Sequence, residues 1–335
     1  MKTIEKNKII DILCYLAENN ELIAPVKGDN HIINFSHINN VNEVTLDFYN
    51  SNDAPKKLFF PQSEDLFAYT EDGKILPPDL DFKKQRVIFG LRPCDTESIK
   101  LLDIIFDGED YKDPYYVSKR KNTVIFSLAC NRPQNSCFCT SFDIGPFHKN
   151  SSDVLVIDSE DKYIFDPASE KGKELIDKIP GLIDATKEEE FNIQKLAEKA
   201  ESRIKEKFNL DGLSDRLEEL FNDDIWDEIH QPCMGCGICT FSCPTCHCFD
   251  IIDEQTDKNG KRVRIWDSCM NPSFTLEASG HTPRPSGRER MRQRIMHKFN
   301  YFYKNYGKFS CVGCGRCLRS CPGGLNIKKV IKRCS

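Results

Sequence analysis

Cysteine is concentrated in two short runs of the chain, and both runs have the same spacing. The residues from Cys233 to Pro244 read C-x2-C-x2-C-x3-C-P, and the residues from Cys311 to Pro322 repeat that spacing. In this pattern three thiolates of one run ligate one cubane, and the cysteine before proline ligates its neighbour. The spacing therefore predicts two [4Fe–4S] clusters that exchange their last ligands. The expected sets are Cys233, Cys236, Cys239 and Cys321 for one cluster, and Cys311, Cys314, Cys317 and Cys243 for the other.

Structural zinc is the main alternative for thiol-rich runs of this kind. Zinc is satisfied by four ligands, typically supplied as two separated C-x2-C pairs, and has no use for a third cysteine two residues further on. Glycines within the runs suit a cluster, because they allow a tight backbone whose N–H groups approach the sulfides. These glycines are Gly235, Gly237, Gly313 and Gly315.

A second set of four cysteines lies in the first part of the chain, where the one other cysteine is Cys14. Two members of the set each follow a predicted buried strand, at residues 85–91 and 122–130, so both thiols are expected at one edge of a sheet. The set predicts a third [4Fe–4S] cluster, with zinc or free thiols in apolar surroundings as alternatives. Its members are Cys94, Cys130, Cys137 and Cys139.

The span between the two runs holds three more thiols, Cys246, Cys248 and Cys269. They are expected to form a further, incomplete metal site or to complete a site with a residue from elsewhere. His247 and His281 lie near cysteines and are candidate ligands, although a single histidine is more often structural. Cys14 and Cys334 stand apart from these groups, as a small apolar side chain of a helix and as a loose terminal thiol.

A basic stretch follows in the same span. It could offset the negative charge of thiolate-bound clusters, bind an acidic partner, or form a solvated helix, and the sequence does not choose among these. Its arginines are Arg284, Arg288, Arg290, Arg292 and Arg294.

The elements that must position these residues predict an α+β protein. An N-terminal mixed α/β domain (1–187) is followed by a charged, solvated helical linker (188–230). A ferredoxin-like domain for two clusters (231–335) carries a long insertion. After an opening helix, strands are expected at residues 31–38, 42–49, 56–60, 85–91 and 122–130, with a hairpin over 153–167. After a turn at Arg92-Pro93-Cys94, a helix that ends near residue 106 is expected to have Asp95 as its N-cap.

Composition narrows the functional classes. The chain has 335 residues, a formal net charge of −5 and 17 cysteines. The charge gives no footprint for nucleic acid, no apolar run is long enough to span a membrane, and the amphipathic start is not a signal peptide. The expected location is the cytoplasm, where thiols stay reduced and bind metal instead of forming disulfides.

The motifs together resemble one family. The segments CMGCGICTFSCPTCHCFDI, WDSCM, GHTPRP, HKFNY and CVGCGRCLRSCP, with FGLRPCDTESIKLLD and ACNRPQNSCFC upstream, are similar to the iron–sulfur subunit of anaerobic sulfite reductases. They are equally similar to the beta subunit of soluble sulfhydrogenases. The resemblance covers most of the chain and favours the second cysteine set as true ligands. The chain departs from the family in its short C-terminus after Cys321.

The resemblance implies an electron-transfer subunit of an anaerobic oxidoreductase complex. Such a subunit takes single electrons from a flavin- and NAD(P)H-binding subunit and passes them to a catalytic subunit, here a sulfite reductase slightly before a nickel–iron hydrogenase. The chain has no G-x-G-x-x-G motif after a strand, so we expect the dinucleotide to bind a partner. The alternatives are a catalytic subunit with a site-differentiated iron–sulfur cluster and a structural zinc protein.

Overall fold

The first part of the chain is built on a mixed sheet. The computed structural model describes residues 1–256 and 258–334, and within them eight strands pair in the order β10-β1-β9-β8-β7-β6-β2-β3. Strands β2, β6, β7 and β8 are parallel, and the remaining pairs are antiparallel. The strands are β1 (Lys2–Glu5), β2 (Glu21–Lys27), β3 (Ile33–His37), β6 (Arg86–Leu91), β7 (Thr123–Leu128), β8 (Val154–Ser159), β9 (Lys162–Pro167) and β10 (Ile183–Asp184).

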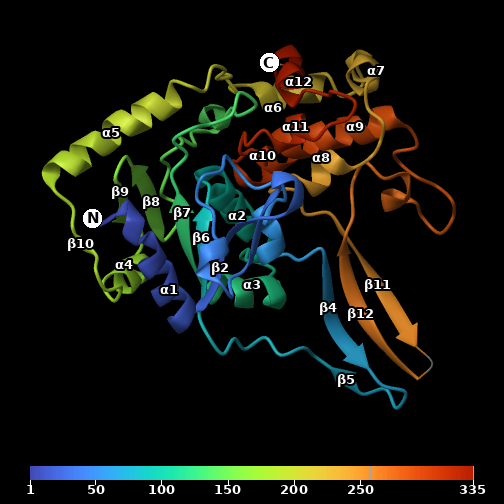
Figure 1. The fold of residues 1–335 in the computed structure, drawn as a ribbon. Coiled ribbons are helices and arrows are strands. Elements are labelled where there is room, and N and C mark those ends of the chain that lie inside the picture. Colours follow the sequence, from blue (N-terminus) through green and yellow to red (C-terminus); the bar gives the residue numbers. More distant parts are fainter. Residues whose placement is uncertain (257, 335) are drawn as a thin grey trace.

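Helices cover both faces of this sheet (Figure 1). In β6, Val87 and Phe89 pack into a core with α1 and α4, whereas Ile88 packs into a core with α2 and α3. Successive residues of a strand point to opposite faces, so one strand supplies both cores. Helix α5 packs against a third group of buried residues at the sheet. The helices are α1 (Ile9–Asn19), α2 (Pro93–Phe106), α3 (Pro114–Lys121), α4 (Glu170–Ile176) and α5 (Lys187–Glu201).

A second, smaller sheet joins distant parts of the chain. Its order is β11-β12-β4-β5, and β12 pairs with β4 in antiparallel fashion. Figure 1 shows it as an arm that extends away from the helices. The insertion between the two cysteine runs is therefore built partly on a strand that precedes it by many residues. The strands are β4 (Ser63–Tyr69), β5 (Ile75–Leu76), β11 (Phe249–Thr256) and β12 (Asn259–Trp266).

The last third of the chain forms a mostly helical unit with its own core. That core includes Trp226, Met291, Phe299 and Ile331, together with several of the cysteines. No helix among the described residues is long and apolar enough to cross a bilayer. The helices are α6 (Leu213–Glu219), α7 (Ile225–His230), α8 (Ile238–Phe241), α9 (Gly287–Met296), the π-helix η7 (His297–Tyr301), α10 (Phe302–Tyr306), α11 (Arg316–Arg319) and α12 (Ile327–Cys334).

Two predicted strands are wrong. Residues 42–49 begin in a 3-10 turn (Val41–Glu43) and make an isolated bridge from Val44 to Val26, beyond the part of β2 (Glu21–Ile23) that pairs with β6. Residues 56–60 belong to a 3-10 turn (Pro55–Leu58), and Phe59 and Phe60 are fully buried beyond it. Their apolar run reflects packing under the sheet and not strand alternation. The strands at 85–91 and 122–128 and the hairpin of β8 and β9 are confirmed.

Three local expectations also need correction. Helix α2 has Arg92 as its N-cap because Pro93 occupies the first helical position, which leaves Asp95 inside the first turn. The segment 188–230 is not a uniformly solvated linker, since α6 and α7 bury Leu217 and Trp226 in the core of the last third. Cys334 is not a loose thiol, because it is 1% exposed in that same core.

Candidate functional site

The cysteines predicted for the first cluster line one cavity. The structure places Cys233, Cys236, Cys239 and Cys321 around it, and we call this set site one. Gly237 has a positive φ of 72° and caps α8, so the run turns sharply and presents its third cysteine from a short helix. Cys236 is exposed, whereas the other three thiols are partly buried. Site one therefore lies near the surface.

The cysteines predicted for the second cluster also lie close together, and we call Cys243, Cys311, Cys314 and Cys317 site two. The thiol of Cys243 interacts electrostatically with each of the other three. Gly315, with a φ of 75°, caps α11 as Gly237 caps α8. Burial raises the pKa of Cys311 and of Cys317 to about 12. Ligand binding by these thiols must therefore release protons.

The third set, Cys94, Cys130, Cys137 and Cys139, lines a further cavity, which we call site three. Cys94 lies in the first turn of α2 after β6, and Cys130 follows β7. Parallel strands end at the same edge of a sheet, so this confirms the predicted placement of these two thiols. Burial is the main cause that raises the pKa of all four thiols.

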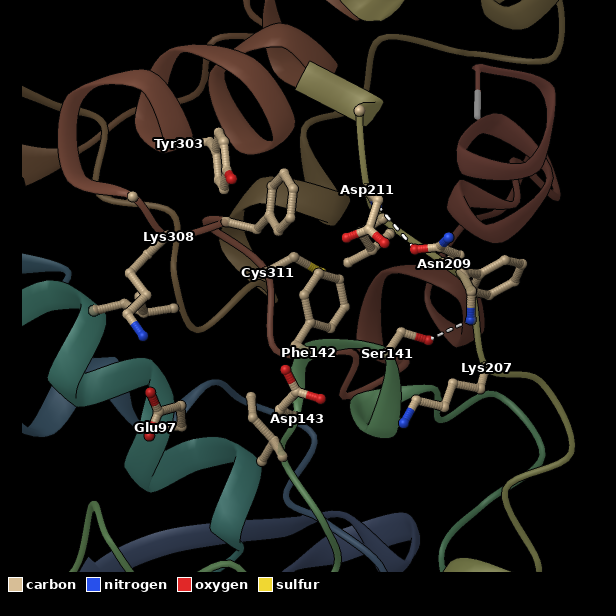
Figure 2. A pocket seen from close by; sticks show the side chains of 17 residues that line it. Glu97, Ser141, Phe142, Asp143, Lys207, Asn209, Asp211, Tyr303, Lys308 and Cys311 are labelled. Atoms are coloured by element: carbon tan, nitrogen blue, oxygen red, sulfur yellow. Dashed lines mark hydrogen bonds between the residues drawn. The ribbon is translucent and has the colours of Figure 1, made fainter. Parts of the chain in front are cut away.

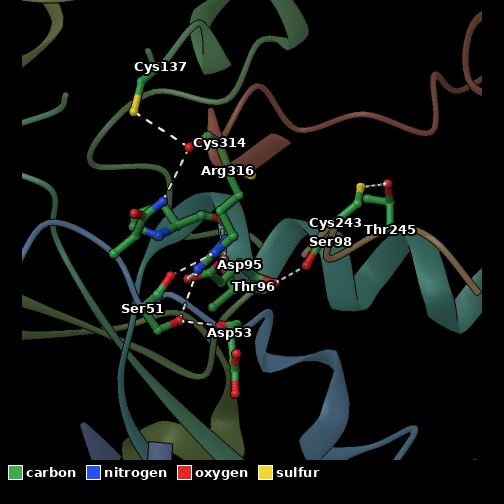
Figure 3. Close-up of polar contacts among 12 residues, drawn as sticks. Ser51, Asp53, Asp95, Thr96, Ser98, Cys137, Cys243, Thr245, Cys314 and Arg316 are labelled. Atoms are coloured by element: carbon green, nitrogen blue, oxygen red, sulfur yellow. Dashed lines mark hydrogen bonds and ion pairs between the residues drawn. The ribbon is translucent and has the colours of Figure 1, made fainter. Parts of the chain in front are cut away.

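The three sites adjoin one another in a row. Cys317 of site two also lines the cavity of site one, and Cys314 of site two also lines the cavity of site three. At the second junction the Phe138 N–H donates to the Gly313 carbonyl at 2.9 Å, and the Cys137 thiol donates to the Cys314 carbonyl at 3.8 Å. The latter contact is drawn in Figure 3. Site two is thus the central member of the row.

The three remaining thiols of the insertion do not form one set, because two of them pair with each other and the third pairs with a cysteine of site two. Cys246 hydrogen-bonds to Cys243 of site two, and Cys248 hydrogen-bonds to Cys269. The bond from Cys269 is the main cause that lowers the pKa of Cys248 to about 7. Among residues 1–256 and 258–334, no three His, Cys, Asp or Glu side chains converge on a point that could hold a single metal ion. The thiols of sites one and three instead stand around cavities.

Each site contains a buried cation without a carboxylate partner among the described residues. Arg294 lines site one and is 2% exposed, and its Nε and Nη1 have no hydrogen-bond partner. Lys298 lies at site two and Arg92 lines site three; both are also buried. An isolated buried cation is strongly destabilising unless an anion compensates it. A [4Fe–4S] cluster with four thiolates is such an anion, so the residues present fit this group.

Two further charged groups stabilise the site two loop. Arg316 donates to the carboxylate of Asp95 through Nη1 at 2.6 Å and Nη2 at 3.1 Å (Figure 3). Its Nε donates to the Ser51 carbonyl at 2.9 Å. Both members of the ion pair are 1% exposed. This bidentate pair links the second cysteine run to the start of α2, and therefore to site three.

A cavity of about 720 Å³ opens beside Cys311 (Figure 2). Aromatic rings form one part of its wall, where Tyr303 stacks on Phe309 with ring centroids 4.6 Å apart. Charged side chains such as Glu97 and Lys308 also line the cavity. Among the lining residues Cys311 is the one cysteine, so this cavity is an opening toward site two and not a further thiol site.

The histidines and arginines of the insertion have separate positions. Burial lowers the pKa of His247 to about 4, and its Nδ1 lies 3.0 Å from the Thr245 carbonyl oxygen. His281 is on the surface beside Glu277. Of the five arginines, Arg294 enters a site. The solvated-helix interpretation is therefore wrong for Arg294, which is buried at a thiol cavity.

Sequence reasoning missed the roles of Lys298, Arg92 and Arg316. Lys298 lies in HKFNY, a segment noticed for its resemblance to a family but given no role. Arg92 directly precedes Pro93 and Cys94, and the proximity of a cation to a candidate ligand was an available signal. Arg316 gave no such signal, because it occupies the position within its run that Ile238 occupies in the first.

Comparison with known proteins agrees with this arrangement of thiols. A family model described as a 4Fe-4S dicluster domain matches residues 232–325. The chain is 34% identical over 318 residues to sulfhydrogenase 2 subunit beta of Pyrococcus furiosus, covering 94% of this chain and 92% of that relative. No solved structure matches the chain. The predicted family resemblance is confirmed: the chain belongs to the sulfhydrogenase beta-subunit family and contains a domain for two [4Fe–4S] clusters.

Proposed function

We propose that the chain is an electron-transfer subunit that holds three [4Fe–4S] clusters, one at each of sites one, two and three. The observation that carries the proposal is the row of sites, in which Cys317 and Cys314 each line the neighbouring cavity. Adjacent clusters exchange single electrons, and the central position of site two makes the row continuous. In this proposal Cys246, Cys248 and Cys269 remain thiols and do not form a fourth cluster.

The buried cations support a cluster at site three as well as in the dicluster domain. Site three differs from the other two in lacking the C-x2-C-x2-C spacing, yet Arg92 is buried there among its thiols. The interaction of Arg92 with Cys130 and Cys94 opposes the desolvation that lowers its pKa. An anionic cluster supplies the missing counter-charge. The same physical requirement therefore applies to all three sites.

Both ends of the row reach the surface. At site one the exposed Cys236 lies between Met234, which is 72% exposed, and Ile238, which is 39% exposed. At site three Cys130 lines an open cavity of about 560 Å³. We propose that one partner subunit contacts each end of the row.

The partners follow from the chemistry of the clusters. A cluster changes by one electron, whereas NAD(P)H delivers a hydride, so a flavin-binding partner must split the pair. The second partner is a catalytic subunit. The sequence alone slightly preferred a sulfite reductase, but the likeness to a sulfhydrogenase beta subunit favours a hydrogenase. We place this complex in the cytoplasm, where the thiols stay reduced.

The experiment is metal analysis of the anaerobically purified protein and of the Cys94→Ser variant. Three clusters give about twelve irons per chain, and the variant is expected to lose about four while it keeps the spectra of the dicluster domain. Cys14→Ser is the matched control, because Cys14 lies on α1 away from the three sites. Zinc in place of iron would overturn the whole proposal. If Cys94→Ser kept its full iron content, the proposed cluster at site three would be contradicted, but the two clusters of the dicluster domain would not.

A further inference from the structure

Lys298 makes an unusual set of contacts at site two. Its Nζ donates to the Cys243 sulfur at 3.2 Å, to the Thr245 hydroxyl at 3.0 Å and to the Ser310 carbonyl at 2.9 Å. An ammonium group has three N–H donors and no acceptor, so three acceptors satisfy it completely. The side chain is 3% exposed, and the partners that the described residues give its ammonium group include no carboxylate. Lys298 therefore places a full positive charge on a candidate cluster ligand.

The local backbone presents this lysine to the site. Lys298 belongs to the π-helix η7, one turn after Arg294 of α9. A π-helical turn is rare and often marks a functional position. The two cations follow one another at an i, i+4 spacing, so both face the thiol sites from the same side of the helix. One continuous helical segment thus supplies a cation to site one and another to site two.

The three sites differ in how strongly charge acts on them. In the described chain Lys298 is the one charged side chain whose donor contacts a candidate ligand sulfur. Arg294 interacts with Cys317 of site two as well as with Cys239 of site one. The Asp95 carboxylate raises the pKa of Cys94 and Cys130 at site three and also of Cys314 at site two, so its charge acts on both sites. Site two is therefore the site at which a buried cation directly contacts a candidate ligand sulfur.

We propose that Lys298 raises the reduction potential of the cluster at site two, so that an electron entering the row preferentially reduces the cluster at this central site. This inference rests on the proposed function, because it assumes a cluster at each site. Reduction adds a negative charge to an anionic cluster. A buried ammonium in contact with a ligand sulfur stabilises the reduced form more than the oxidised form. Lys298 is thus a positioning residue for the electron.

The test is a potentiometric titration of the intact anaerobic complex, followed by electron paramagnetic resonance, for Lys298→Met. We expect one of three midpoints to fall by about 59 mV or more, which is a tenfold shift in a one-electron equilibrium. Lys298→Arg keeps the charge and is expected to restore most of the midpoint. Lys304→Met is the matched control, because Lys304 lies on α10 in an exposed ion pair with Glu218.

Failure of this inference and failure of the proposed function give different results. If the unmodified complex lacks three reducible clusters, the proposed function is wrong. If the unmodified complex has three reducible clusters and the three midpoint potentials of Lys298→Met equal those of the control Lys304→Met, Lys298 does not raise the potential of site two. A purely structural role would shift no midpoint and would lower iron content in both Lys298 variants. Should Lys298→Met lose iron, Lys298→Gln, which keeps an N–H donor without charge, decides by the same titration.

Discussion

The two cysteine runs share their spacing but not their surroundings. Ile238 in the first run is 39% exposed, whereas Arg316 at the equivalent position of the second is 1% exposed. A methyl group at Gly235 would meet nothing within 4 Å, but at Gly313 it would lie 2.5 Å from the Cys139 backbone nitrogen. Charged residues are normally exposed and large apolar residues buried, but here Ile238 is exposed and Arg316 is buried.

This difference separates what a motif determines from what its neighbours determine. Gly237 and Gly315 have nearly the same φ, 72° and 75°, and each precedes a one-turn helix. The spacing therefore fixes the loop and the ligand set. Tertiary contacts decide that the first loop ends the row of sites at the surface and that the second loop lies in its centre.

The largest expected effect comes from the buried charge that distinguishes the two runs. Arg316→Met leaves the Asp95 carboxylate buried without its partner, and breaking such a pair costs about 3–5 kcal/mol of unfolding free energy. Ile238→Met at the equivalent exposed position should stay within about 0.5 kcal/mol of the unmodified protein. Denaturant titration of anaerobic samples measures both. Equal losses in the two variants would mean that the second run is no more embedded than the first.

A smaller contrast is expected between the equivalent glycines. Gly235→Ala and Gly313→Ala both place a side chain at a positive φ, which costs roughly 1–2 kcal/mol each. Gly313→Ala also forces a methyl group against the Cys139 backbone, and such overpacking adds about 1–3 kcal/mol. Iron analysis should show that Gly313→Ala also depletes site three. If Gly235→Ala is the more destabilised variant, the packing of the second run on site three is contradicted.

The smallest effect on stability is expected at the exposed end of the row. Met234→Lys should change the unfolding free energy by no more than about 0.5 kcal/mol, because the side chain is 72% exposed. The same change should weaken the association of the purified chain with its partner subunits, since it places a charge beside Cys236. Tyr111→Lys, at a side chain that is 84% exposed on another part of the surface, is the control. If both variants associate with the partner subunits as the unmodified chain does, the proposal that a partner contacts the surface at site one is contradicted.

Local patterns predicted the elements that depend on local sequence. The buried strands β6 and β7, the hairpin of β8 and β9 and the helix over 93–106 were expected, because apolar runs and turn residues mark them directly. The segments 42–49 and 56–60 were mistaken for strands, because exposure and pairing depend on what lies next to them. The pairing of β12 with β4 has no local signal at all.

For the thiol sites, too, the local sequence predicted some features and tertiary contacts determined the others. The grouping of the motif cysteines was predicted from spacing, and the structure brings both sets together as expected. The surrounding cations were not predicted, because a lysine such as Lys298 in a basic stretch carries no mark of burial. Arg294 was one of five arginines, and only the helix packing shows which of them enters a site.

The pairing of β12 with β4 has a consequence for synthesis of the chain. Lys261 of β12 contacts Asp65 of β4, which precedes it by 196 residues. On the ribosome, β4 can pair with β5 soon after synthesis, but β12 follows only after the first cysteine run has emerged. An unpaired strand edge invites aggregation. Polypeptides released before residue 259 should therefore aggregate more readily than the full chain, and the arm is completed only after the first run has become accessible to the machinery that supplies iron.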